Sequence, residues 1–237
     1  MSYKHICISF VLFAFCLTGA LAQTLNADLK AANLAIANTR ELSMEIQYNF
    51  YCSCKQSVVS ESKTSIMAKK GSSYYTVNGT SEMVTIGTLQ LSINNTQKQI
   101  VLMKSANVGI SEISKKIEGL LKIAKRTQYK LVGNEKIYTL VINEYGLSEI
   151  EIRIQKSNSM ISRIVFFQSE TIQAEIKGKK ATCKQPKTEI VFSNIRLNVT
   201  QNPAKFRMNT YIEKRKDGTY QPVGAYKEYQ LIDRTRN

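Results

Sequence analysis

The residue types that carry most enzymatic chemistry are scarce in this chain. Histidine occurs once among 237 residues, as His5, near the very start. Without further histidines, a serine or cysteine nucleophile has no imidazole base beside it and a zinc ion has no imidazole ligand. The glycine-rich phosphate-binding motifs are absent as well. The sequence therefore predicts a protein that is not an enzyme and that needs no cofactor or metal.

Glu149 and Glu151 are the pair that a reaction based on two carboxylates, such as glycoside hydrolysis, would use. They alternate with Ile150 and Ile152, so both carboxylates point to the polar face of one predicted strand. A solvated sheet surface explains this pattern, and we assign the pair no catalytic role.

The cysteines leave two interpretations open. Cys52 and Cys54 share one face of a predicted strand, with Cα atoms about 7 Å apart, which is the outer limit for a disulfide. The pair either extends the apolar core face of that strand, or one of the two, Cys52 or Cys54, forms a disulfide with Cys183.

Residues 1–22 are typical of a cleaved secretory signal peptide. Lys4 and His5 precede an apolar run from Ile6 to Leu17, and Ala20-Leu21-Ala22 supplies a cleavage site of the small-x-small type. No later segment approaches the roughly 18 continuous apolar residues of a membrane span. We therefore expect a single domain over 23–237, soluble and monomeric, that is periplasmic or secreted.

Apolar periodicity predicts a helix, a run of strands, a second helix and a second run of strands. The strongest local signal is the alternation from Leu42 to Cys54, where every even position is apolar or cysteine, as expected for a long strand with one buried face. Asn78-Gly79 predicts a type I′ hairpin turn. The expected helices are 25–37 and 111–125, and the expected strands are 42–54, 58–69, 72–77, 81–86, 88–94, 98–104, 128–133, 136–143, 148–156, 160–168, 171–176, 188–199 and 206–212, with a basic loop at 177–187.

These elements define a fold class. Eleven or so antiparallel strands in two runs, with a helix before each run, predict a mainly β (α+β) protein. Its core would be one large curved antiparallel sheet with two or so helices packed on one face.

The charge balance of the chain indicates which kinds of partner it could bind. The formal net charge is +15, but the basic residues are scattered and no nucleic-acid recognition module is present, so we expect no nucleic-acid partner. Only three short clusters stand out, and they make an anionic membrane surface a candidate partner. The clusters are Lys177-Gly-Lys-Lys180, Lys214-Arg-Lys216 and Arg234-Thr-Arg236.

Several longer segments resemble the lipoprotein carriers LolA and LolB. They are Ser65-Ile-Met-Ala-Lys-Lys-Gly-Ser-Ser-Tyr-Tyr-Thr-Val-Asn-Gly79, Gly87-Thr-Leu-Gln-Leu-Ser-Ile-Asn94, and Ile190-Val-Phe-Ser-Asn-Ile-Arg-Leu-Asn198 followed by Asn202-Pro-Ala-Lys-Phe206. The resemblance implies a half-open barrel whose concave side is covered by helices and holds acyl chains. The chain departs from the family by showing Lys69-Lys70-Gly71 where Arg-Pro is common, and by having no tryptophan.

The resemblance leads to a functional hypothesis. We expect an exported, non-enzymatic carrier or binding protein for lipoproteins or lipid acyl chains. The alternative is a structural or adhesion β-domain of the cell envelope, with a filled interior and no lipid ligand. The candidates for lining a ligand cavity are Leu42, Met44, Ile46, Tyr48, Phe50, Ile113, Ile117, Leu120 and Leu121.

Overall fold

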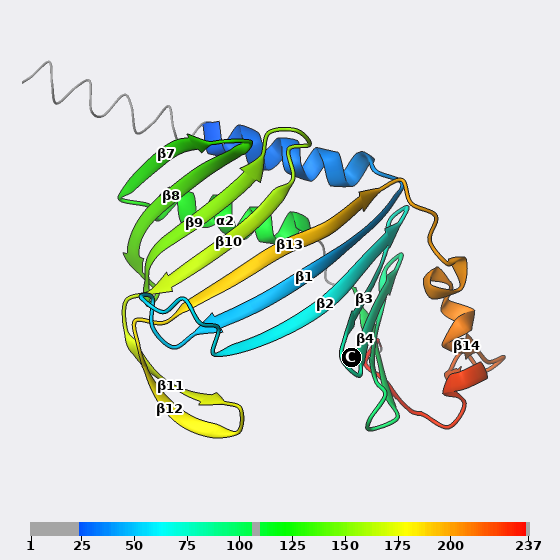
Figure 1. Cartoon of the computed structure of the whole chain (residues 1–237). Helices are drawn as coiled ribbons and strands as arrows, with labels where there is room; N and C mark the ends of the chain where they lie inside the picture. Colours follow the sequence, from blue (N-terminus) through cyan, green and yellow to red (C-terminus); the bar gives the residue numbers. More distant parts are fainter. Residues whose placement is uncertain (1–23, 106–109, 236–237) are drawn as a thin grey trace, which may run out of the picture. The chain divides into compact units, whose positions relative to one another are not determined.

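The computed structural model describes residues 24–105 and 110–235 (Figure 1). The predicted signal peptide, 1–22, lies outside the described residues. The helices are 24–38 and α2 (Ile110–Ile123). The strands are β1 (Glu41–Tyr51), β2 (Glu61–Lys70), β3 (Ser73–Asn78), β4 (Ser81–Ile86), β5 (Leu89–Asn94), β6 (Gln99–Lys104), β7 (Arg126–Val132), β8 (Glu135–Glu144), β9 (Leu147–Gln155), β10 (Ile161–Gln168), β11 (Thr171–Ile176), β12 (Lys179–Lys184), β13 (Lys187–Leu197), β14 (Ile212–Lys214), β15 (Tyr220–Pro222) and β16 (Gln230–Asp233).

Twelve of these strands form one sheet, in the order β16-β6-β5-β4-β3-β2-β1-β13-β10-β9-β8-β7. Strands β2 to β6 pair antiparallel with their neighbours, as do β7 to β10, while β16 joins β6 in parallel. The sheet is open, because β16 and β7 stand at its two edges. Two hairpins, β11–β12 and β14–β15, stand outside it. The predicted mainly β class, with a large open antiparallel sheet and two helices in the described residues, is confirmed.

Two tight turns differ from the sequence prediction. The hairpin at Asn78 is present, but its central residues are Gly79 and Thr80, and only Gly79 has a positive φ, so the predicted type I′ turn is wrong. The predicted basic loop at 177–187 is also wrong. Lys177 (φ 50°) and Gly178 (φ 76°) make a two-residue turn, after which the chain returns as β12. The lysines of β12 obscured its strand pattern.

The predicted strand at 206–212 is wrong over most of its length. The 3-10 helices η1 (Pro203–Phe206) and η2 (Met208–Thr210) occupy this segment, and β14 begins only at Ile212. Pro203 at the first helical position suits η1, and the Asn202 side chain accepts a hydrogen bond from the Ala204 backbone N–H. A third 3-10 helix, η3 (Gly224–Tyr226), precedes β16.

The chain divides into two compact units, each with its own packing. The first unit contains 24–35, 48–62 and 113–191, and the second contains 36–47, 63–105, 110–112 and 192–235. Strands β1, β2 and β13 contribute residues to both. The prediction of a single domain over 23–237 stays a prediction.

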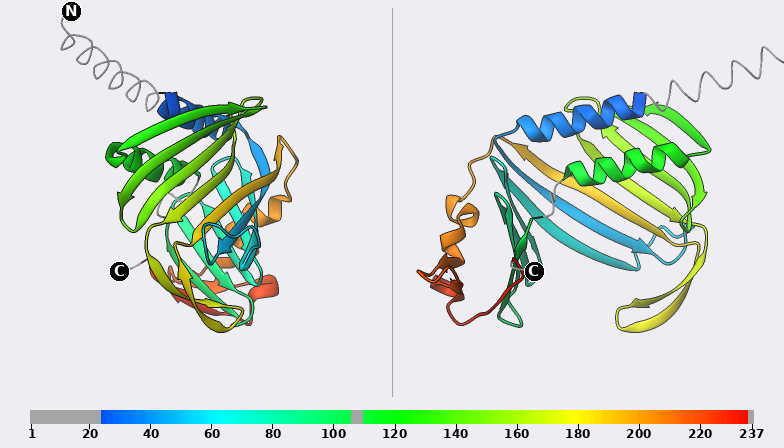
Figure 2. Two further views of the ribbon diagram at one scale, coloured as in Figure 1. Left: turned by 60° about the vertical axis from the view of Figure 1, so that its left-hand side comes forward. Right: turned by 180° about the vertical axis from the view of Figure 1, so that it is seen from behind.

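In the first unit, both helices lie on one side of β7–β10 (Figure 2, right). The strand residues on that side are fully or almost fully buried, namely Tyr138, Leu140, Ile142, Ile150, Ile152 and Ile154. Asp28 ties helix 24–38 to β8, because its carboxylate accepts hydrogen bonds from Lys136 Nζ at 2.8 and 2.9 Å and from the Tyr138 hydroxyl at 2.5 Å. This partly buried ion pair fixes the register of the helix on the sheet.

In the second unit, the C-terminal segment packs against β3–β6. Phe206, Tyr211 and Ile212 are buried in a cluster with strand residues such as Val84 and Leu91. A carboxylate lies at the border of this cluster and holds both layers. Glu82 accepts hydrogen bonds from the Tyr75 hydroxyl at 2.9 Å, the Asn95 amide at 2.8 Å and the Tyr226 hydroxyl at 3.5 Å.

Strand β1 changes its buried face along its length. Leu42, Met44 and Ile46 are buried as predicted, but Tyr48 is 39% exposed and the next buried residues are Asn49 and Tyr51. At this end Glu189 of β13 accepts hydrogen bonds from the Asn49 amide at 3.1 Å and the Tyr51 hydroxyl at 2.9 Å. The expectation of one buried face therefore holds only for the first half of the strand.

A disulfide joins Cys52, directly after β1, to Cys183 in β12, with Cα atoms 4.5 Å apart. Cys54 keeps a thiol and is half-buried. The bridge spans 131 residues of sequence and ties β12, near the base of the β11–β12 hairpin, to the end of β1. Closing so long a loop restricts the unfolded chain.

Replacing Cys52 and Cys183 together by serine is expected to lower the free energy of unfolding by about 2–4 kcal/mol, because the unfolded chain regains its freedom. Urea denaturation of a chain of residues 23–237 measures this. Cys54→Ser serves as the matched control and should change stability little. An equal loss in both variants, or three reactive thiols in the unreduced protein, would contradict the assignment.

Asp28→Asn is expected to destabilise the protein by about 1–3 kcal/mol, since it leaves the Lys136 ammonium without its partner. Lys30→Gln, at an exposed position of the same helix, is the control for loss of a charge. The midpoint of urea unfolding should fall for Asp28→Asn alone. If both variants unfold at the wild-type midpoint, Asp28 does not hold the helix to β8.

Candidate functional site

Strands β2–β6 present two chemically different faces. One face, called here the core face, is covered by the C-terminal segment and carries aliphatic residues such as Val84, Leu91 and Leu102. The opposite face, called here the Gln90 face, combines thioether, hydroxyl, amide and amine groups. Its members follow from the strand register and are Met67, Lys69, Tyr74, Thr76, Met83, Thr85, Gln90, Ser92, Val101 and Met103.

The register arranges the Gln90 face in two rows across the strands. One row runs Lys69, Tyr74, Thr85, Gln90 and Met103, each opposite the next on the neighbouring strand. Directly opposite residues lie about 5 Å apart at Cβ, so each side chain is the neighbour of the next one along the row. The parallel row runs Met67, Thr76, Met83, Ser92 and Val101.

Lys69 ends the first row and is an unusual residue to find buried, with only 4% of its surface exposed. Its ammonium donates hydrogen bonds to the backbone carbonyls of Ala37 at 3.3 Å and of Thr39. Ala37 lies in the last turn of helix 24–38, where unpaired carbonyls favour a cation. Burial lowers the pKa of this amine.

Gln90 lies in the middle of the first row and is buried. Its amide nitrogen lies 3.3 Å from Met83 Sδ and 3.8 Å from Met103 Sδ. Thioether sulfur is a weak acceptor, so this amide retains hydrogen-bonding capacity for a stronger acceptor. Burial also raises the pKa of the Tyr74 hydroxyl, two strands away in the same row, so this group stays a neutral donor.

The exposure of side chains in both rows shows where a ligand would gain contact. Met83, Val101, Met103 and Tyr74 are half-buried, so each keeps part of its surface accessible to solvent. Methionine is flexible and polarisable, and it adapts to ligands of irregular shape. The Gln90 face can therefore accept an apolar chain beside a small number of hydrogen-bond donors.

The residues predicted to line a cavity divide between the units. Leu42, Met44 and Ile46 are buried in the second unit, whereas Tyr48 is exposed and Phe50 is half-buried in the first. On α2, Ile117 is buried and Leu120 and Leu121 are half-buried. The side chain of Ile113 lies outside the described ones. Their role in lining a cavity stays a prediction.

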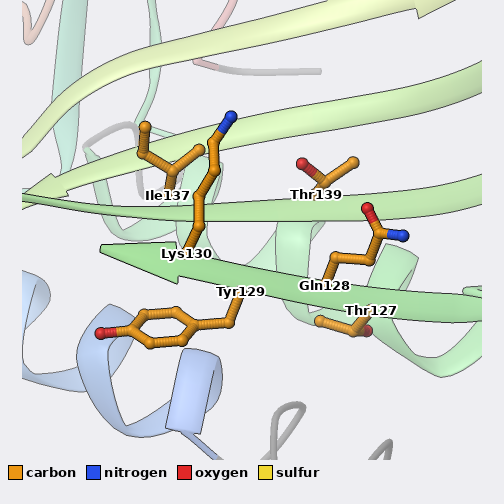
Figure 3. A pocket seen from close by; sticks show the side chains of 6 residues that line it. All are labelled: Thr127, Gln128, Tyr129, Lys130, Ile137 and Thr139. Atoms are coloured by element: carbon orange, nitrogen blue, oxygen red, sulfur yellow. The ribbon is translucent and has the colours of Figure 1, made fainter. Parts of the chain in front are cut away.

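A hollow of about 400 Å³ lies at β7 and β8 of the first unit (Figure 3). Lys130, Gln128, Ile137 and Thr139 point to one side of the strands, while Tyr129 and Thr127 point to the other. This volume is at the lower end of the range for ligand pockets, on the order of 300–1,000 Å³. The lining is mixed, with polar side chains beside Ile137 and the ring of Tyr129.

Glu149 and Glu151 lie on the same side of the sheet as Lys130 and are not simply solvated, as the sequence suggested. Both are half-buried, and Arg153 Nε donates to Glu151 at 2.7 Å. Burial, followed by the charge of Glu151, raises the pKa of Glu149. The arrangement is an ion-pair network across β8 and β9, extended by Arg153 to Glu135 at 3.5 Å.

Sequence reasoning missed the Gln90 face. It identified the strands correctly, but it selected apolar runs as ligand contacts and passed over a face with mixed polarity. The signal that could have found it is Gln90 itself, an amide placed directly before the apolar Leu91 and beside two methionines once the hairpins are paired.

Metal sites and helical membrane spans are both missing from the described part of the chain. No group of three or more histidine, cysteine, aspartate or glutamate side chains in 24–105 and 110–235 is placed to hold a metal ion. Over the same residues, neither helix is long and apolar enough to span a bilayer.

No protein-family model matches the chain, and no curated protein matches it either. Among solved structures, it is similar to an uncharacterised conserved protein from Thermus thermophilus, with 12% identity, 89% of this chain and 99% of that chain covered, and a TM-score of 0.48. It is also similar to a LolA superfamily protein from Nitrosomonas europaea, with 8% identity, coverage of 77% and 97%, and a TM-score of 0.34.

A further similar structure is the lipoprotein LppX from Mycobacterium tuberculosis, with 13% identity, 76% of this chain and 98% of that chain covered, and a TM-score of 0.33. All three chains differ strongly from this one in sequence. One of them is described as a member of the LolA superfamily, the family that the sequence resembles.

Proposed function

We propose that this protein is an exported binding protein that carries an acyl chain or an acylated protein on the Gln90 face of β2–β6, without catalysing a reaction. The observation that carries the proposal is the contrast between the two faces of the same strands. The core face is filled by the C-terminal segment of the chain, whereas the Gln90 face keeps half-buried methionines beside buried polar groups.

The chemistry of the two rows suits a ligand with an apolar tail and a polar carbonyl group. The tail would lie along Met83, Val101 and Met103, gaining the hydrophobic free energy of the surface it covers. An ester, amide or carboxyl oxygen would accept hydrogen bonds from the Gln90 amide and the Tyr74 hydroxyl. Such a ligand would replace the weak contacts that Gln90 makes with sulfur.

A role without catalysis is supported by what surrounds these groups. The Gln90 face has no carboxylate, cysteine or histidine among its ten members, so it offers no nucleophile with a matching base. Lys69 is engaged by the backbone carbonyls of Ala37 and Thr39. We therefore assign the face to binding alone, and the signal-like sequence of residues 1–22 supports a location in the periplasm or outside the cell.

Displacement of a fluorescent fatty acid tests the proposal directly. The mature wild-type protein is expected to bind the probe, and the variant Met83→Gln with Met103→Gln is expected to bind it at least about tenfold more weakly, because two amides must then be desolvated under the acyl tail. Lys104→Gln is the matched control, since it places the same side chain next to Met103 at an exposed position of β6.

Two outcomes would contradict the proposal. One is that the wild-type protein fails to bind the probe, and the other is that the methionine variant and Lys104→Gln bind it equally well. Failure to bind would favour the alternative function, a structural or adhesion β-domain of the cell envelope. Thermal unfolding of each variant shows whether a loss of binding is a loss of the fold.

A further inference from the structure

The β11–β12 hairpin is separate from the large sheet. It forms a two-stranded sheet of its own and projects away from β10 and β13 in Figure 1. An isolated two-stranded hairpin is only marginally stable in water. Here the Cys52–Cys183 disulfide at its base holds it in place, which suggests that its projecting position serves a purpose.

The register gives this hairpin one apolar and one polar face. Ile172, Ala174 and Ile176 of β11 lie opposite Cys183, Ala181 and Lys179 of β12, so these six residues share a face. The two isoleucines are half-buried and keep part of their surface accessible. On the other face, polar residues such as Gln173 and Thr182 bond to each other.

The tip of the hairpin is basic. Lys177, Lys179 and Lys180 are all exposed and surround the turn at Gly178. Within the hairpin, Glu175 opposite Lys180 is the one residue of negative charge. Lysines beside apolar residues can place their stems along apolar surface while the ammonium groups reach polar surroundings.

Exposed apolar side chains also lie on the two segments bonded to the stems of the hairpin. The backbone N–H of Cys54 donates a hydrogen bond to the backbone carbonyl of Gln185 at 2.8 Å. The loop that follows Cys54 carries Val58, which is 76% exposed. The backbone N–H of Ser169 donates a hydrogen bond to the backbone carbonyl of Gly146 at 2.9 Å. Gly146 directly follows Tyr145, which is 80% exposed. Tyrosine is enriched where proteins meet the interface of a bilayer.

We propose that the β11–β12 hairpin docks this protein on the surface of an anionic lipid bilayer. Lys177, Lys179 and Lys180 contact the negative headgroups, and Ile176 enters the interfacial region beside them. Basic residues attract the protein to such a surface, and a neighbouring apolar side chain keeps it there. The proposal concerns a different part of the molecule from the Gln90 face and does not depend on it.

Flotation with vesicles measures docking. The mature wild-type protein is expected to float with vesicles of equal parts phosphatidylglycerol and phosphatidylcholine, and to stay behind with pure phosphatidylcholine. Lys179→Glu with Lys180→Glu is expected to reduce the bound fraction at least about tenfold, given roughly fivefold per lysine removed from such a surface. Lys214→Glu with Lys216→Glu is the matched control, because it makes the same change of charge at exposed positions around β14.

A single tryptophan tests the entry of the hairpin, since the chain has none of its own. The emission of Ile176→Trp is expected to shift to shorter wavelength with phosphatidylglycerol vesicles and to be quenched by brominated lipid. Tyr220→Trp, on β15, should do neither. Fatty-acid displacement should be unchanged in the hairpin variants, which separates a failure here from a failure of the proposed ligand site.

Three results would overturn the proposal. They are the absence of wild-type binding to anionic vesicles, an equal loss of binding in the two charge-reversal variants, and an unshifted emission of Ile176→Trp on bound protein. Binding to a soluble acidic polymer as tight as to vesicles, together with unshifted emission, would identify the hairpin as a site for acidic macromolecules and not for lipid.

Discussion

The packing of the C-terminal segment on one face of β3–β6 is the interaction on which the rest of the second unit depends. Phe206, Tyr211 and Ile212 bury the aliphatic core face, and Glu82 links the strands to this segment through tyrosine hydroxyls. Burial, followed by the charge of Glu82, raises the pKa of Tyr226 to about 12, so this hydroxyl stays a donor. Because the hydrophobic core of this unit forms between the segment and the core face, the opposite face does not have to be apolar. It can therefore contain amides, hydroxyls and thioethers.

In the first unit the two faces of the sheet also differ, but other contacts cover them. The apolar residues on one face of β8 and β9 are buried, and Asp28 holds helix 24–38 against this face. The other face is covered by ion pairs, such as Arg163 with Glu189 at 3.0 Å and Arg153 with Glu151 at 2.7 Å. Polar groups are therefore paired with strong partners on the outer face of this unit, whereas the Gln90 amide of the second unit contacts weakly accepting sulfur atoms.

Local periodicity was sufficient to predict most of the fold. The helix at 24–38, the alternation in Leu42–Ile46 and the strands of the two meanders follow from apolar spacing alone. The errors fall where long-range partners decide the structure. β16 exists because it pairs with β6, β12 because a short turn returns it to β11, and the change of face in β1 because Glu189 meets Asn49 and Tyr51. The Gln90 face could not be predicted for the same reason, since it becomes visible only when five strands are set in register.

Methyl resonances of labelled methionine test most directly whether an acyl ligand lies on the Gln90 face. Titration with a fatty acid is expected to shift the methyl signals of Met67, Met83 and Met103, which share that face, and to leave those of Met160 and Met208 unchanged. Shifts confined to Met160 or Met208, or no shift at any methionine at saturating fatty acid, would contradict this expectation.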